Sequence, residues 1–159
     1  MLHRAAVALG SNLGDRRATL DGALRALQDR AFVRACSSFI ETAPVGGVAE
    51  GTFLNAACVL ETDLPPRDLL ELLLEVERRF GRDRAREQRW GSRTLDLDLI
   101  LYDDRVVDEP GLRLPHPRLH ERLFVLDPLA EIAPDWVVPT FGRSVRALCD
   151  ALRASEAYG

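Results

Sequence analysis

Apolar positions along the chain recur with two periods, one typical of strands and one typical of helices. Continuous or alternating apolar runs predict strands, and these runs fall at residues 5–9, 32–42, 53–61 and 95–102. Apolar residues three and four apart predict amphipathic helices, which begin at about Asp15, Pro66 and Ser144. The second and third strands flank a Gly- and Pro-rich loop at 43–51, so we expect them to pair as a hairpin.

Residues at the ends of these segments set the expected boundaries. Asp15 is a favoured N-cap residue, Pro65-Pro66 is typical of a helix start, and Gly81 is a natural helix stop. We expect the last helix to end at about Leu152. Six prolines divide the region after residue 103 into short pieces, and these are Pro110, Pro115, Pro117, Pro128, Pro134 and Pro139.

The order of the predicted elements favours one fold class. A β-α-β-β-α-β order is the ferredoxin-like arrangement, an α+β fold in which two helices cover one face of an antiparallel sheet. With 159 residues, of which 47% are hydrophobic and 29% charged, the chain can bury a core without disulfides. We therefore expect a single domain over residues 1–159.

Charge and composition narrow the class of protein further. The net charge of -4 and the pI of about 5.4 give no reason to expect nucleic-acid binding. Since no apolar run approaches the ~20 residues of a membrane span, we expect no membrane association and a cytoplasmic location. We also expect a monomer. All 21 basic residues are arginine, so a P-loop lysine and a lysine general base are excluded. An anionic ligand must therefore be bound by arginine, histidine, backbone N–H groups or a metal.

Two carboxylates in the fourth predicted strand have the spacing of a metal site. Alternation in a strand places Asp96 and Asp98 on one face, about 7 Å apart along the chain. Such a pair repels itself unless a cation lies between the two groups, and hard oxygen ligands suit Mg²⁺. The alternative is an ordinary solvent-facing pair on an edge strand.

An arginine cluster leads directly into this carboxylate pair. Seven of the 21 arginines lie between residues 78 and 93. A solvated surface loop is the alternative for such a charge run. However, a Mg²⁺-polyphosphate site requires arginines beside paired carboxylates, because guanidinium groups bind the phosphate oxygens that the metal does not bind. His116, held between two prolines, is a candidate phosphate donor.

Aromatic and amide side chains indicate a second ligand. Strand alternation places Phe53 and Asn55 on one face, next to the loop that begins after Thr42, and Phe124 follows the Pro115-His116-Pro117 segment. Core packing is the alternative for both phenylalanines. An aromatic pair with an amide nearby would suit a flat heteroaromatic ligand.

Together, these blocks resemble the 6-hydroxymethyl-7,8-dihydropterin pyrophosphokinase family. The resemblance rests on residues 8–15 (ALGSNLGD), the Arg82/Arg84 loop, Arg93-x-x-Asp96-Leu97-Asp98, and residues 115–117 with Arg122-x-Phe124. It implies a ferredoxin-like α/β/α sandwich. It also implies transfer of the pyrophosphoryl unit of ATP to the hydroxymethyl group of the pterin, which releases AMP in folate biosynthesis.

The resemblance also implies roles for individual residues. Asp96 and Asp98 match ligands of two Mg²⁺ ions and, with Arg82 and Arg93, form the expected catalytic set. Nucleotide-contacting positions are matched by Glu77, Arg82, Arg84, Arg93, His116 and Arg122. Pterin-contacting positions are matched by Thr42, Pro44, Val45, Phe53, Asn55 and Phe124. Gly111 and Arg113 stand where some members carry arginine and threonine near the nucleotide.

Two other functions remain open from the residues alone. A D-x-D pair is also found in metal-dependent glycosyltransferases, although these are usually considerably longer chains. A non-catalytic ferredoxin-like ligand-binding module is the third possibility, but it leaves the arginine loop and the D-x-D face unexplained. Formation of AMP from ATP in the presence of the pterin distinguishes the three.

Overall fold

A computed structural model describes residues 1–42, 52–81 and 94–158 of the chain, and its centre is a five-stranded antiparallel sheet. The strand order is β2-β4-β1-β5, and β3 pairs with β4 beyond the end of β2. The strands are β1 (His3–Ser11), β2 (Phe32–Cys36), β3 (Ile40–Thr42), β4 (Phe53–Thr62) and β5 (Asp96–Tyr102). The predicted pairing of the second and third strands is confirmed.

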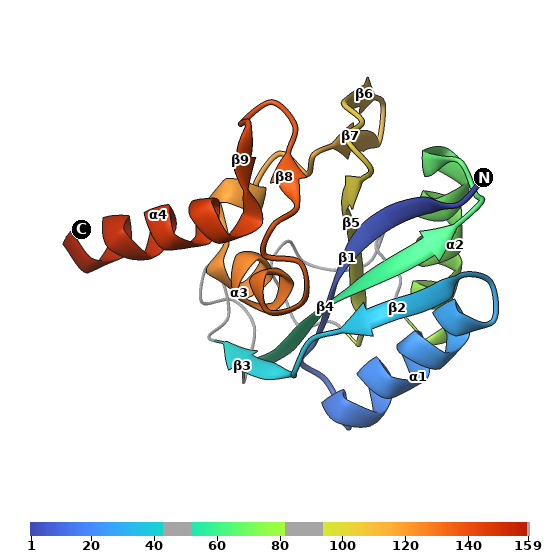
Figure 1. The fold of residues 1–159 in the computed structure, drawn as a ribbon. Coiled ribbons are helices and arrows are strands. Elements are labelled where there is room, and N and C mark those ends of the chain that lie inside the picture. The colour runs from blue at the N-terminus through green and yellow to red at the C-terminus, as the bar shows by residue number, and fades with distance from the viewer. Residues whose placement is uncertain (43–51, 82–93, 159) are drawn as a thin grey trace.

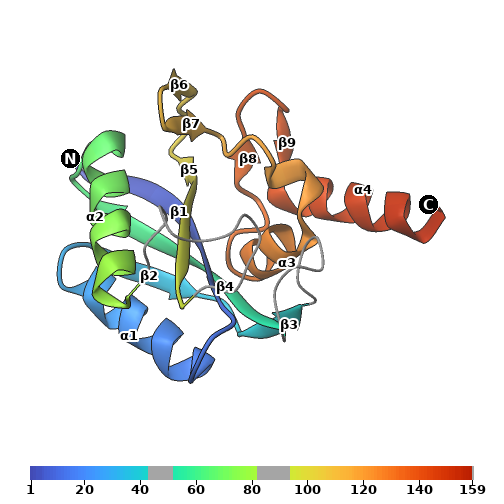
Figure 2. The ribbon, with the colours of Figure 1, turned by 180° about the vertical axis from the view of Figure 1, so that it is seen from behind.

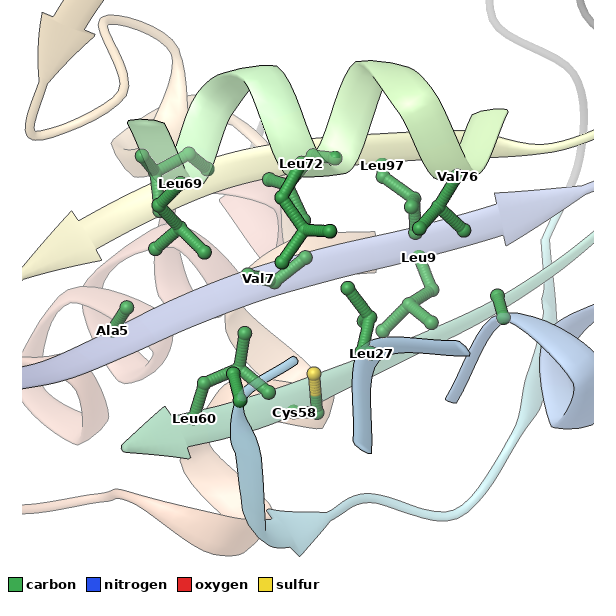
Figure 3. Packing of buried hydrophobic residues seen from close by; sticks show 14 of the residues in the cluster. Ala5, Val7, Leu9, Leu27, Cys58, Leu60, Leu69, Leu72, Val76 and Leu97 are labelled. Atoms are coloured by element: carbon green, nitrogen blue, oxygen red, sulfur yellow. The ribbon is translucent and has the colours of Figure 1, made fainter. Parts of the chain in front are cut away.

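Helices α1 (Arg16–Gln28) and α2 (Pro66–Arg79) cover one face of this sheet (Figure 1). The Asp15 carboxylate accepts a hydrogen bond from the backbone N–H of Ala18 at 3.1 Å, so Asp15 is the N-cap that its position predicts. Leu69, Leu72 and Val76 of α2 pack over Val7 and Leu97 of the sheet (Figure 3). The predicted β-α-β-β-α-β order and its helical face are therefore confirmed.

A second helical layer covers the opposite face of the sheet, which makes three layers (Figure 1). The sheet presents small residues there, Ala6, Ala8 and Ala57, so α3 (Leu123–Ile132) packs closely against it. The remaining elements are β6 (Val107–Glu109), β7 (Leu112–Leu114), the 3-10 helix η2 (Leu119–Glu121), β8 (Val137–Val138), β9 (Arg143–Ser144) and α4 (Val145–Tyr158). The whole is the expected ferredoxin-like α/β/α sandwich with a mainly antiparallel sheet.

Two expected boundaries were wrong, and one helix was not expected. Residues 32–42 are not one strand, because β2 ends at Cys36, just before Ser37. The Ser37 Oγ accepts a hydrogen bond of 2.9 Å from the Ala57 N–H, in place of the backbone carbonyl that would accept it in a continuous strand. Helix α3 was not expected because Pro128 lies inside it. An interior proline removes one helical hydrogen bond and crowds the preceding turn, and α3 forms in spite of this. The last helix continues past Leu152 to Tyr158.

A bulge interrupts β5 near its end. Val7 of β1 lies opposite Leu99 and Ala6 lies opposite Leu101, so Ile100 is an extra residue in β5. Before the bulge, Leu97 and Leu99 point into the core beneath α1 and α2, as their alternation predicts. After it, Ile100 and Leu101 contribute to the core beneath α3, and Tyr102 returns to the first core.

Candidate active site

The two carboxylates lie together on the sheet face that α3 covers. Asp96 is opposite Gly10 and Asp98 is opposite Ala8 in the antiparallel register with β1. Cross-strand partners share a face, and Ala8 packs in the core of the α3 layer. Both carboxylates are half-buried. The predicted placement of the pair on one face is confirmed.

Glu77 of α2 fixes the strand from its other side. Its side chain is only 2% exposed, and its Oε2 accepts a hydrogen bond of 2.7 Å from the backbone N–H of Leu97. This N–H points away from β1. Because β5 is at the edge of the sheet, the N–H needs a hydrogen-bond partner outside the sheet. Glu77 thus holds the backbone between the two aspartates.

His116 is attached to the β5 bulge. Its backbone N–H donates to the Ile100 carbonyl at 2.9 Å, and its ring Nδ1 accepts from the Arg118 N–H at 3.1 Å. Burial, followed by repulsion from Arg122, lowers the pKa of His116 to about 4, while Asp96 opposes this shift. The ring is therefore neutral near pH 7, and its proton is on Nε2, which is a donor.

A groove of about 430 Å³ lies at the outer edge of β5, beside α2, β7 and His116 (Figure 2 shows β5, α2 and β7). Leu70, Leu74 and Leu112 supply an apolar wall, and Asp98 and His116 supply polar groups. Gly111 and Arg113, expected near the nucleotide, also line it. The groove combines a surface for a flat apolar ring with a polar region for charged groups.

The amide and aromatic residues lie on the other side of the carboxylates. Asn55 of β4 is opposite Gly10, and its Nδ2 donates to Thr42 Oγ1 of the adjacent strand β3. Phe53 lies opposite Thr42 and flanks the same face as Asn55. These contacts bring Thr42, Phe53 and Asn55 together, as the sequence predicts.

Phe124 is the second residue of α3 and packs at the border of the core beneath that helix. The Arg122 guanidinium lies 5.5 Å from the centre of the Phe124 ring. The charge of Arg122 also lowers the pKa of His116, so Arg122 interacts with the candidate phosphate donor as well. The start of α3 therefore joins the two halves of the site.

Several expected site residues lie outside the described part of the chain, and these are Pro44, Val45, Arg82, Arg84 and Arg93. Sequence reasoning also missed two contributors among the described residues. The Arg118 N–H, which sets the His116 tautomer, is a backbone group and leaves no side-chain pattern. Gly10 was visible only as part of a motif, although it is the register partner of both Asn55 and Asp96.

Comparison with known proteins identifies the family. The sequence model described as 7,8-dihydro-6-hydroxymethylpterin-pyrophosphokinase (HPPK) matches residues 6–134. The chain belongs to this family. HPPK relatives include the 2-amino-4-hydroxy-6-hydroxymethyldihydropteridine pyrophosphokinases of Synechocystis sp. and Bacillus subtilis. The first is 43% identical over 98% of this chain and 80% of the relative, and the second is 48% identical over 80% and 77%.

The fold of the chain is also that of solved HPPK structures. Plasmodium falciparum HPPK-DHPS, crystallised with pterin and p-hydroxybenzoate, matches 99% of this chain with a TM-score of 0.77 at 16% identity. The match covers 43% of that chain, so this chain spans less than half of its length. Within the described ranges of this HPPK chain, no helix is long and apolar enough to cross a membrane.

Proposed function

We propose that this site transfers the pyrophosphoryl group of ATP to the hydroxymethyl group of 6-hydroxymethyl-7,8-dihydropterin, releasing AMP in folate biosynthesis. The observation that carries the proposal is a row of residues across three strands. Asn55, Gly10 and Asp96 are neighbours in register, so an amide pocket and a carboxylate share one face. The groove at the outer edge of β5 adds a place for the nucleotide next to Asp98.

The donor set of Asp96 and Asp98 fits Mg²⁺. Both offer hard oxygen ligands from one face, and the described residues contain no group of three or more His, Cys, Asp or Glu side chains that could hold a metal ion. Mg²⁺ typically takes one or two carboxylates and completes its shell with waters and phosphate oxygens. We propose that the two carboxylates hold two such ions. When bound, they would neutralise charge on the phosphate oxygens.

The nucleotide is held by the groove and by the cationic residues next to it. The apolar wall of Leu70, Leu74 and Leu112 packs against the base, and His116 Nε2–H donates to a phosphate oxygen. Arg122 acts beside His116. On the family resemblance, Glu77 lines the nucleotide site and Arg82, Arg84 and Arg93 bind the remaining phosphate oxygens, which arginine does bidentately.

The pterin is held on the opposite side of the carboxylates. Its edge is bound by Asn55 and Thr42 with the backbone at Pro44 and Val45, and its faces are covered by Phe53 and Phe124. This arrangement brings the hydroxymethyl oxygen toward the phosphates. Phosphoryl transfer depends mainly on in-line positioning and on charge stabilisation, so these residues act by holding both substrates in place.

We further propose that the protein acts as a monomeric single domain over residues 1–159 in the cytoplasm. ATP is its pyrophosphoryl donor. The three cysteines are free thiols, as expected in a reducing compartment, and these are Cys36, Cys58 and Cys149. Light scattering coupled to size-exclusion chromatography tests the oligomeric state. A dimer mass would contradict the monomer without affecting the reaction.

Incubation with ATP, Mg²⁺ and 6-hydroxymethyl-7,8-dihydropterin tests the reaction directly. We expect AMP and the pterin pyrophosphate in equal amounts. Release of ADP, or no turnover, would contradict the proposed transfer. Family membership does not favour a glycosyltransferase or a non-catalytic binding module.

A further inference from the structure

Gly10 occupies the centre of the candidate site without contributing a side chain. It is the register partner of Asn55 in β4 and of Asp96 in β5, and partners in an antiparallel sheet share a face. Neighbouring strands are about 4.8 Å apart, so the amide and the carboxylate flank a strip roughly 10 Å wide. The middle of this strip is bare backbone.

The backbone of Gly10 does not itself require glycine. The residue lies inside β1, and its φ is outside the left-handed region in which Gly14 and Gly111 lie. A glycine within a strand destabilises it relative to alanine, because it loses more conformational freedom on folding. The reason for glycine at this position must therefore lie in the space around it.

The space beside Gly10 is filled by Asn55. A Cβ atom at position 10 would lie 3.0 Å from Asn55 Oδ1 and 3.8 Å from Phe53 Cδ1. The first distance is too short for an ordinary van der Waals contact, so the Asn55 amide would have to move. The amide oxygen thus lies in the place that any side chain at position 10 would need.

Asn55 has little freedom to give way. Its side chain is buried, with 6% of its surface exposed, and its Nδ2 donates to Thr42 Oγ1. A methyl group at position 10 would push the amide by a few tenths of an ångström against the partner that holds it. The hydrogen bond to Thr42 holds the amide in one orientation, and the absence of a side chain at Gly10 leaves room for its oxygen.

We propose that Gly10 is a positioning residue for the pterin, because its lack of a side chain leaves room for the Asn55 amide in the orientation held by Thr42 and keeps the strip between Asn55 and Asp96 open. The inference rests on the proposed function, since it concerns the same pterin pocket. It assigns to Gly10 a selective effect on the flat heteroaromatic substrate. The nucleotide groove lies at the outer edge of β5, so ATP binding should not depend on Gly10.

Gly10→Ala tests this proposal in the full-length protein. Calorimetry measures binding of 6-hydroxymethyl-7,8-dihydropterin in the presence of Mg²⁺ and a non-hydrolysable ATP analogue, and binding of the analogue alone. We expect the pterin Kd to rise about tenfold or more, because an added methyl group overpacks the site. We expect the Kd of the ATP analogue to stay within about twofold. We expect only a small change in melting temperature, because the gain from alanine in a strand and the cost of overpacking oppose each other.

A second pair of variants shows whether the effect acts through Asn55. In an Asn55→Ser background the amide oxygen is gone, so adding Gly10→Ala should change the pterin Kd by less than about twofold, a non-additive result. A wild-type pterin Kd in the Gly10→Ala protein would overturn the proposal. An equal loss in both backgrounds would also overturn it. If Gly10→Ala fails to fold but the double variant folds, the clash with Asn55 is supported.

These measurements also separate the proposal from the proposed reaction. A wild-type protein that binds the pterin but forms no AMP contradicts the pyrophosphoryl transfer and leaves the Gly10 comparison intact. A wild-type protein that forms AMP, with a Gly10→Ala variant of unchanged pterin Kd, contradicts only the role of Gly10.

Discussion

Replacement of Glu77 should show how strongly the stability and position of β5, the strand that carries Asp96 and Asp98, depend on one buried side chain. Glu77 is 2% exposed and accepts the Leu97 N–H at 2.7 Å, between the two aspartates. Alanine leaves this buried N–H without its acceptor, which costs about 1–3 kcal/mol. For a domain of this size, about 2 kcal/mol corresponds to a fall of roughly 4–8 °C in the melting temperature.

The same change should lower turnover through the position of β5. Because Leu97 lies between Asp96 and Asp98, movement of its backbone moves both carboxylates, and a displacement of about 1 Å can cost about 100-fold in rate. We expect kcat for AMP formation to fall more than tenfold in Glu77→Ala. Glu77→Gln keeps an acceptor oxygen at the same distance along the side chain, so it should lose less than about 1 kcal/mol of stability.

Glu75→Ala is the matched control on the same helix. Glu75 forms an exposed i,i+4 pair with Arg79 at 3.0 Å, and such pairs contribute about 0.3–0.5 kcal/mol. Thermal unfolding and AMP formation should therefore be close to wild type. If Glu77→Ala melts at the same temperature as Glu75→Ala, the Leu97 N–H does not depend on Glu77 and the reasoning is refuted.

Three further predictions concern the metal, the pterin and pH. Asp96→Asn or Asp98→Asn should leave the circular dichroism spectrum intact but reduce turnover by roughly 3 kcal/mol, more than 100-fold, and near-wild-type rates at ordinary Mg²⁺ would refute the metal assignment. Phe124→Ala should weaken pterin binding by roughly 1 kcal/mol beyond the effect of lost burial, and should weaken ATP binding by less, as measured by calorimetry. If the variant instead unfolds and its folded molecules bind the pterin with unchanged affinity, Phe124 serves core packing. Because the pKa of His116 falls from 6.5 to about 4 on folding, its contribution to stability is complete above pH 6.5 and is lost as pH falls toward 4. His116→Gln should remove up to about 3 kcal/mol of this pH dependence in urea unfolding, whereas parallel curves for the two proteins would contradict the shift.

The parts of the fold that follow a single period could be predicted from sequence. Alternation placed Asp96 and Asp98 on one face with Leu97 on the other, and helical spacing located α1 and α2, because each pattern reflects one buried side of one element. The N-cap role of Asp15 follows from local chemistry in the same way.

The features that the sequence did not predict depend on contacts between distant residues. The bulge at Ile100 is hidden because residues 99–102 are buried in one core or the other, so their hydrophobicity does not reveal the face. The end of β2 depends on Ser37 bonding to Ala57, twenty residues away. The state of His116 depends on its burial, on a turn N–H from Arg118 and on the charge of Arg122, none of which a lone histidine in a sequence indicates.

The extra residue in β5 constrains how the length of this strand can change. Deletion of Ile100 would restore simple alternation, with Leu101 still opposite Ala6 and Tyr102 still opposite Ala5, so the Tyr102 hydroxyl could keep its hydrogen bond of 2.6 Å to the Leu64 carbonyl. The deletion would, however, remove the carbonyl that anchors His116. Loss of this one residue would therefore disturb the core beneath α3 and the phosphate donor at once, while Asp96 and Asp98 keep their place beside β1. We expect the extra residue to matter for the position of His116 and not for the pairing of β5 with β1.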